Sequence, residues 1–183
     1  MRSSASAWRA RCYPDPVIPR PDLRVERVER LDAARLESLG LRGLLLDLDE
    51  TLMPAGAAAP AAGVVAWARA LLAAGVRMAI VSNGRRERVA AASAALGVPA
   101  RAWAGKPWPG AFRRGLAQLD LPASAVAMVG DQLFTDVAGA RAAGLRTVLV
   151  PPLSDAGLPH TRMLRRLESV LLEGGERGRP VHR

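Results

Sequence analysis

Five short apolar runs, each followed by a longer helix-like segment, constrain the fold of this chain more than any other feature of its sequence. The runs cover residues 43–48, 77–81, 100–104, 125–129 and 146–150. Candidate helices with apolar residues at three- and four-residue spacing cover 61–74, 85–96, 109–119, 134–143 and 160–172. Strands that alternate with helices in this way are typical of a parallel sheet with helices on both faces. We therefore predict one three-layer α/β domain with a central parallel sheet of about five strands.

The two ends of the chain differ in composition from this alternating region. Residues 1–22 are basic and rich in proline, which predicts an extended lead-in, whereas 32–39 suit a short helix before the first strand. Residues 174–183 are rich in glycine and arginine, and we predict a disordered tail. A chain of 183 residues can bury one sizeable core but has little room for a second. The folded domain is therefore assigned to 23–173.

Charge and cysteine content narrow the classes of partner and compartment. The formal net charge of +9 favours an anionic partner, such as a phosphate ester, an acidic membrane surface or nucleic acid. The single cysteine, Cys12, excludes an intramolecular disulfide and fits a reducing compartment. The N-terminal residues hold no apolar signal region, and arginines interrupt the most hydrophobic stretch, 57–81. We therefore predict a cytoplasmic protein without a membrane-spanning helix.

Acidic side chains follow two of the predicted strands. Asp47 and Asp49 end the run 43–48, and Asp131 and Asp136 follow the run 125–129. The carboxyl ends of parallel strands meet at one edge of a sheet, so we expect the two pairs to approach each other. Either pair alone is compatible with a solvated turn or a helix cap. Together they predict a site for a hard divalent cation such as Mg²⁺, which takes oxygen ligands.

Two further polar groups follow the second and third runs. Ser82, Asn83 and Gly84 precede a helix and offer a hydroxyl and backbone N–H groups to a phosphate oxygen, although a simple helix cap explains them as well. Lys106 is the only lysine among 26 basic residues. A site that requires a compact ammonium rather than a planar guanidinium would explain it, and a solvated loop lysine is the alternative.

In this order, the residues resemble the four motifs of the haloacid dehalogenase (HAD) superfamily, whose fold is Rossmann-like. The matching positions are Asp47-Leu48-Asp49-Glu50-Thr51, Ser82, Lys106, and Gly130-Asp131 with Asp136. The chain is most similar to the YqeG-type phosphatases of subfamily IIIA, which resemble phosphatidylglycerophosphate phosphatases. That similarity rests on Val81-Ser82-Asn83, Gly130-Asp131-Gln132-Leu133-Phe134-Thr135-Asp136, Pro14-Asp15, and Thr161 with Arg165 and Glu168, and it runs from about Pro14 to Leu171. Glu50 departs from the pattern, where the family usually has Asn; it adds negative charge beside Asp47, which bears on substrate fit and not on the reaction class.

The resemblance implies a mechanism and a role for each matching residue. Asp47 would attack phosphorus to form an aspartyl-phosphate, and Asp49 would protonate the leaving oxygen and then activate water. Mg²⁺ would be held by Asp47, the main-chain carbonyl of Asp49, and Asp131. The expected phosphate-binding residues are Ser82, Lys106, Asn83 and Thr51. Asp136 would orient Asp131 or Lys106 from outside the ligand set.

The short interval between Asp47 and Ser82 leaves no room for a large cap domain. By resemblance, an open site implies a substrate that covers it, such as a protein or a phospholipid headgroup at a membrane. Trp8, Arg9 and Arg11 would suit peripheral contact with the inner face of an anionic membrane. A soluble phosphorylated metabolite or nucleotide is the alternative substrate. The sequence leaves the oligomeric state open.

Two other classes of function use some of the same residue types. A phospho-accepting receiver domain also has acidic residues and a lysine on a parallel sheet. However, receivers place the acceptor after the third strand, whereas Asp47 follows the first predicted one. A nucleic-acid-binding module is favoured only by net charge, because aromatic residues make up 4% of the chain and the arginines are scattered. We therefore expect no nucleic-acid partner.

Overall fold

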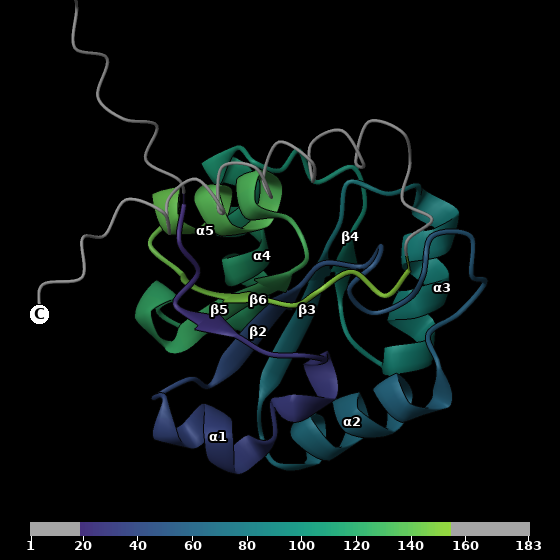
Figure 1. Ribbon diagram of the computed structural model, residues 1–183, viewed down its shortest axis with the longest axis horizontal. Coiled ribbons are helices and arrows are strands. Elements are labelled where there is room, and N and C mark those ends of the chain that lie inside the picture. The colour runs from purple at the N-terminus through teal and green to yellow at the C-terminus, as the bar shows by residue number, and fades with distance from the viewer. Residues whose placement is uncertain (1–18, 155–183) are drawn as a thin grey trace, which may run out of the picture.

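The computed structural model describes residues 19–154, which form one six-stranded parallel sheet with helices on both faces (Figure 1). The strands are β1 (Leu23–Arg24), β2 (Gly43–Leu46), β3 (Arg77–Val81), β4 (Ala100–Arg101), β5 (Val126–Gly130) and β6 (Arg146–Leu149). Their order across the sheet is β1-β6-β5-β2-β3-β4, and every neighbouring pair is parallel. The predicted α/β class is confirmed, and β1 is added to the five predicted strands.

The two layers of helices lie on opposite faces of this sheet (Figure 1). One face is covered by α1 (Ala33–Ser38), α2 (Ala62–Ala73) and α3 (Arg86–Leu96), and the other by α4 (Pro109–Leu119) and α5 (Gly139–Ala142). Leu44 and Leu46 of β2 contribute to the first core, and Leu45 between them contributes to the second. Since side chains alternate along a strand and both faces are covered, the central strands read as continuous apolar runs.

Local sequence explains where one helix begins, where a second ends and how closely a third packs. The side chain of Asp32 accepts a hydrogen bond from the Arg35 amide at 2.8 Å and caps the start of α1. Gly97 ends α3 in the left-handed conformation, at φ 70°. In α4, a Cβ on Gly115 would lie 2.8 Å from a methyl carbon of Val81. Glycine at this position therefore lets α4 approach the sheet closely.

The predicted helix 134–143 has a less regular form than expected. A wide π-type turn, Leu133–Ala138, comes first, and the four-residue α5 continues from it. The turn carries the buried Asp136, whose Oδ2 accepts a hydrogen bond from the Gln132 amide at 3.1 Å. Such wide turns are frequent at functional sites. Here the turn directs Asp136 back towards the end of β5.

The lead-in to residue 18, the helix predicted at 160–172 and the tail 174–183 lie outside residues 19–154, so the domain boundaries stay predictions. Between β2 and β3, which the structure describes throughout, only a loop and α2 occur, as expected for a fold without a large cap. In 19–154, none of the helices is both long and apolar enough to cross a membrane.

Candidate active site

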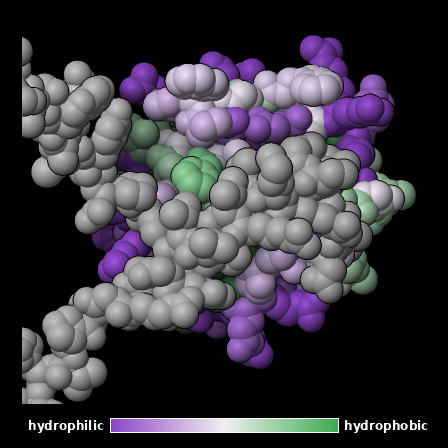
Figure 2. All heavy atoms as spheres, turned by 45° about the horizontal axis from the view of Figure 1, so that its top comes forward, coloured by the Kyte–Doolittle hydropathy of each residue, from purple (hydrophilic) through white to green (hydrophobic). Residues whose placement is uncertain are grey.

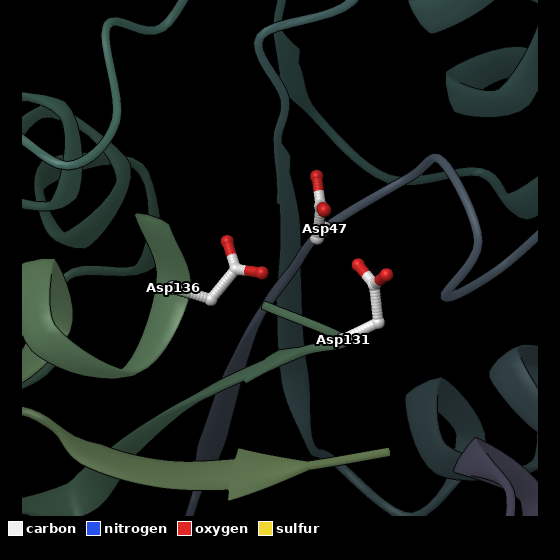
Figure 3. A group of neighbouring side chains, drawn as sticks. All are labelled: Asp47, Asp131 and Asp136. Atoms are coloured by element: carbon white, nitrogen blue, oxygen red, sulfur yellow. The ribbon is translucent and has the colours of Figure 1, made fainter. Parts of the chain in front are cut away.

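Three buried aspartates meet at the carboxyl edge of the sheet (Figure 3). Asp47 directly follows β2, Asp131 directly follows β5, and these two strands are neighbours. Asp136 reaches the same place from the π-type turn. One carboxylate oxygen from each lies within 4.8 Å of the others, and in Figure 3 the carboxylates face a common space. The structure thus brings together the two acidic segments that the sequence places after separate strands.

Lys106 lies between two of these carboxylates. Its ammonium nitrogen is 2.7 Å from Oδ1 of Asp47 and 2.7 Å from Oδ1 of Asp136. The lysine side chain is 2% exposed, so protein groups and not solvent surround it. The sequence predicts that Asp136 orients Asp131 or Lys106; the structure shows its contact with Lys106, and the orienting role stays a prediction. The ammonium partly neutralises a cluster that still holds more negative than positive charge.

Asn83 holds the main chain that carries Lys106. Its Oδ1 accepts hydrogen bonds from the amides of Gly105 at 3.0 Å and Lys106 at 2.9 Å, and its Nδ2 donates to the carbonyl of Lys106 at 2.9 Å. These bonds join segments 23 residues apart in the sequence. The structure therefore places Asn83 as a support for the lysine loop, and direct contact of its amide with phosphate stays a prediction.

The side chains of Ser82 and Asp49 both lie close to Gly84. The buried Ser82 hydroxyl accepts a hydrogen bond from the Gly84 amide at 2.9 Å. A Cβ on Gly84 would lie 2.9 Å from Oδ2 of Asp49 and 3.0 Å from Oγ of Ser82, so a larger residue would force them apart. Gly84 thus allows the expected phosphate-binding hydroxyl and the expected general acid to face the same small space.

Asp49 is bound by an arginine that the sequence analysis did not single out. Oδ1 of Asp49 is 2.7 Å from Nη2 of Arg88. The same guanidinium donates to the carbonyl of Pro54 through Nη2 and to the carbonyl of Ala57 through Nη1. The Asp49 carboxylate lies outside the group of three that could hold a metal, which fits the expected use of its main-chain carbonyl. Three exposed or half-exposed arginines begin α3, and no local pattern distinguishes Arg88 from the other two.

Glu50 does not act as a free negative charge beside Asp47, although its position in the sequence suggests that it would. It is 3% exposed and adopts φ 63°, a left-handed conformation that Asn tolerates better than Glu. Its carboxylate accepts hydrogen bonds at 2.8 Å from the Ala55 amide and from both the amide and the hydroxyl of Ser154. The added negative charge is therefore not free beside Asp47, because it binds donors of two loops. Its consequence is structural: it fixes the loop after β2 to the chain that follows β6.

Thr51 has a buried hydroxyl without a partner in the part of the chain that the structure describes. Thr51 is 1% exposed, and its Oγ1 forms no hydrogen bond with any group of residues 19–154. A buried polar atom without a protein partner is normally satisfied by water or a ligand. This observation is compatible with the expected phosphate-supporting role of Thr51.

Burial and mutual repulsion control the ionisation of the cluster. Burial raises the pKa of Asp47 to about 8, Lys106 opposes this rise, and the carboxylates of Asp136 and Asp131 add to it. Burial would lower the pKa of Lys106, but Asp136 and Asp47 raise it overall, so the ammonium keeps its charge. A buried set of three carboxylates and one ammonium suits a hard divalent cation, which would stabilise the ionised form of Asp47.

The stability of the metal-free protein should consequently depend on pH. Asp47 has a raised pKa in the folded state, so its contribution is fully present below about pH 4 and is lost as the pH rises to about 8. We expect the unfolding temperature in EDTA to fall by about 4 °C or more between about pH 5 and pH 8. Addition of Mg²⁺ should raise the unfolding temperature more at about pH 8 than at about pH 5. Differential scanning fluorimetry measures both effects, and a pH-independent magnesium shift would contradict this account.

Comparisons with known proteins agree with the geometry. A family model described as HAD-hydrolase-like matches residues 103–152. The chain is 31% identical over 157 residues to "Probable phosphatase YqeG" of Bacillus subtilis, an alignment that covers 86% of this chain and 91% of that protein. It is 33% identical over 158 residues to the chloroplastic phosphatidylglycerophosphate phosphatase 1 of Chlamydomonas reinhardtii, covering 81% of this chain and 59% of that protein.

A solved structure supports the fold. The deoxy-D-mannose-octulosonate 8-phosphate phosphatase of Haemophilus influenzae superposes with a TM-score of 0.53 at 16% identity, over 74% of this chain and 89% of that chain. At this identity the likeness concerns the arrangement of the sheet and helices alone.

Proposed function

The chain belongs to the YqeG-like phosphatases of the HAD superfamily, and from this premise we propose that it is a magnesium-dependent phosphomonoester hydrolase that works through an aspartyl-phosphate on Asp47. One observation carries the proposal. Asp47 lies at the carboxyl end of the central strand β2, where Lys106 contacts one of its oxygens and two further carboxylates face it. A carboxylate held against an ammonium in a shielded site is oriented for attack on phosphorus.

The donor set fits the expected cation. Asp47 and Asp131, with the main-chain carbonyl of Asp49, would hold Mg²⁺, while the ammonium of Lys106 occupies one oxygen of Asp136. When bound, Mg²⁺ supplies positive charge that offsets repulsion between the phosphate and an anionic nucleophile. The ammonium of Lys106 would stabilise the same negative charge from the other side.

The reaction then divides into two displacements at phosphorus. In the first, an oxygen of Asp47 forms a bond to phosphorus, the bond to the leaving oxygen breaks, and Asp49 donates a proton to that oxygen. In the second, Asp49 takes a proton from water, whose oxygen attacks phosphorus and releases phosphate from Asp47. The proposal requires Asp49 to face the substrate, and its contact with Arg88 would hold it in that orientation.

Arg88 should act as a positioning residue for Asp49. We expect Arg88→Ala to lower kcat about 10- to 100-fold for alkyl phosphates, because an outer residue that orients a reacting group typically has this effect. The loss should be smaller for p-nitrophenyl phosphate, because its leaving oxygen needs little protonation. KM should change little, and Arg88→Lys should restore part of the rate.

Arg86→Ala, at an exposed position on the same helix, is the matched control for this prediction. Steady-state assays with an alkyl phosphate and with p-nitrophenyl phosphate give kcat and KM for wild type, Arg88→Ala and Arg86→Ala. An equal loss for both leaving groups would show that Arg88 supports the fold and not the proton transfer.

The substrate is proposed from kinship and from the lack of a large insertion between β2 and β3. A relative 33% identical over most of this chain is a phosphatidylglycerophosphate phosphatase, and only one helix separates β2 from β3. We therefore assign as substrate a phosphate ester on a phospholipid headgroup, with phosphatidylglycerophosphate as the first compound to test. The proposal includes a peripheral location at the cytoplasmic face of the membrane.

A phosphate-release assay tests this function. Purified protein is incubated with phosphatidylglycerophosphate in mixed micelles and, separately, with a panel of soluble sugar and nucleotide phosphates, with Mg²⁺ or EDTA. We expect release that requires Mg²⁺ and has the highest kcat/KM for the lipid. Turnover of soluble esters alone would remove the lipid assignment, and release that persists in EDTA would contradict the metal requirement.

A further inference from the structure

Three large apolar side chains are exposed among the residues that the structure describes, and all follow strands that end at the active site. They are Trp103 at 65%, Trp108 at 74% and Phe134 at 37% exposed. The two tryptophans stand three residues before and two residues after Lys106. Phe134 lies between Asp131 and Asp136. On the face shown in Figure 2, most of the coloured surface is hydrophilic, and hydrophobic residues form small separate groups.

The segment 102–110, which carries Trp103 and Trp108 and is called the tryptophan loop below, forms hydrogen bonds with another loop of the site. The amide of Trp103 donates to the carbonyl of Gly84 at 3.3 Å, beside Ser82, and Asn83 binds the main chain of Lys106. Trp103 adopts φ 48°, a left-handed conformation that is costly for a bulky residue. The backbone of Trp103 is therefore strained, although its side chain, 65% exposed, buries little apolar surface that could offset the strain. Strain of this kind is concentrated at functional sites.

Two of the loops around the site also lack exposed charge. From residue 102 to 110 the only charged side chain is Lys106, which is buried against the aspartates. From residue 51 to 68 there is no charged side chain at all, and the exposed residues of the first part of this segment are Pro54, Gly56, Ala58 and Ala59. These two loops thus form an apolar rim, whereas Lys106 and the aspartates that they surround are charged.

Arginines flank this apolar rim. Arg85 and Arg86 are exposed at the start of α3, directly after the Ser82 loop, and Arg113 and Arg114 are exposed on α4, which begins beside Trp108. The guanidinium of Arg114 donates to the carbonyl of Ala104 at 2.9 Å, so it lies against the tryptophan loop. Tryptophan and arginine together are typical of surfaces that enter the headgroup region of a bilayer.

We propose that Trp103 and Trp108 form a docking rim that places the mouth of the active site on an anionic phospholipid bilayer. This inference rests on the proposed function and names the surface through which the lipid headgroup would reach Asp47. The indoles would enter the interface, and the arginines beside them would contact the negative lipid headgroups. The net charge of +9 complements such a surface. A headgroup phosphate that leaves the membrane plane would then face the buried Lys106 directly.

Vesicle sedimentation tests the docking rim without any need for turnover. The full chain is mixed with vesicles of phosphatidylglycerol and phosphatidylcholine in equal amounts, which carry no phosphomonoester. We expect the double variant W103A/W108A to bind at least about tenfold more weakly than wild type, and W103F/W108F to keep most of the affinity. Binding to pure phosphatidylcholine should also be weak. Equal unfolding temperatures for the two double variants would show that the loss is not a folding defect.

Trp8→Ala is the matched control, since it makes the same change in the N-terminal segment. A loss of binding with Trp8→Ala but not with W103A/W108A would overturn the proposal, as would equal binding of wild type and W103A/W108A. Because the vesicles hold no substrate, failure here leaves phosphate release from micellar or soluble esters untouched. Conversely, an inactive protein that still binds through Trp103 and Trp108 would refute only the proposed function.

Discussion

Replacing Asp47 by asparagine is expected to lower magnesium-dependent phosphate release by about 10³-fold or more while raising the stability of the metal-free protein. The rate falls because an amide oxygen cannot serve as the nucleophile, and loss of a nucleophile typically removes most of the chemical acceleration. The stability rises because the variant removes a buried carboxylate whose pKa is raised to about 8 by burial, with two further carboxylates adding to the rise. The two effects have opposite signs, which a folding defect cannot produce.

Steady-state assays and thermal unfolding in EDTA at about pH 8 measure this pair of effects. Asp120→Asn is the matched control, because it makes the same chemical change at an exposed residue in the loop that follows α4. We expect the control to keep wild-type activity and to show the same dependence on Mg²⁺ as wild type. An Asp47→Asn protein that is active, or that is less stable than wild type in EDTA, would contradict the role assigned to Asp47.

Replacing Lys106 by methionine should reduce both stability and activity. Methionine has a similar length but no charge, and it would leave the carboxylates of Asp47 and Asp136 buried without the ammonium that lies 2.7 Å from each. Removal of one partner from a buried ion pair costs about 3–5 kcal/mol of unfolding free energy. Loss of a cation that stabilises the transferring phosphoryl group should lower kcat by about 10²–10³-fold.

Urea unfolding in EDTA and in Mg²⁺ measures the effect on stability. The cation should stabilise Lys106→Met more than wild type, since it would replace part of the missing positive charge. The double variant Lys106→Met with Asp136→Asn should lose less than the sum of the two single changes, because one unpaired charge disappears with the second substitution. Additive losses, or a stable Lys106→Met protein, would show that the three groups are not coupled.

The elements that the sequence predicts well are those whose signal is local. The runs at 43–48, 77–81 and 125–129 are apolar because both faces of a parallel strand are covered, and each becomes a central strand. The acidic residues that follow 43–48 and 125–129 therefore indicate the functional edge from the sequence alone. The strand β1 was missed because it has two residues, and its place depends on Asp22, whose carboxylate accepts from the amide and hydroxyl of Thr147.

The contacts that the sequence could not supply join distant segments. Glu50 binds Ser154, 104 residues away, and Arg88 binds Asp49, 39 residues away. The π-type turn that carries Asp136 was predicted as ordinary helix, because periodicity does not distinguish the two forms over six residues. In each case a side chain contacts a segment distant in the sequence, and the residues next to that side chain do not indicate the contact.

Glu50 shows most clearly how a tertiary contact changes an interpretation. Taken from the sequence alone, an extra carboxylate beside Asp47 suggests a change in substrate fit. In the structure, this carboxylate accepts hydrogen bonds from the loop that follows it and from Ser154. The substitution for the family's usual Asn therefore bears on loop structure, and the ionic character of the site is set by the three aspartates and Lys106.

The central claim is that phosphate passes through a covalent bond to Asp47, and rapid-quench peptide mapping tests it most directly. Wild-type protein is mixed with excess substrate and Mg²⁺, quenched in acid within the first turnover, digested and examined by mass spectrometry. The account predicts a peptide that carries one added phosphoryl group on Asp47, sensitive to hydroxylamine, and absent when Asp47→Asn is used or Mg²⁺ is omitted. A phosphoryl group on another residue, or turnover with no modified peptide at any quench time, would contradict it.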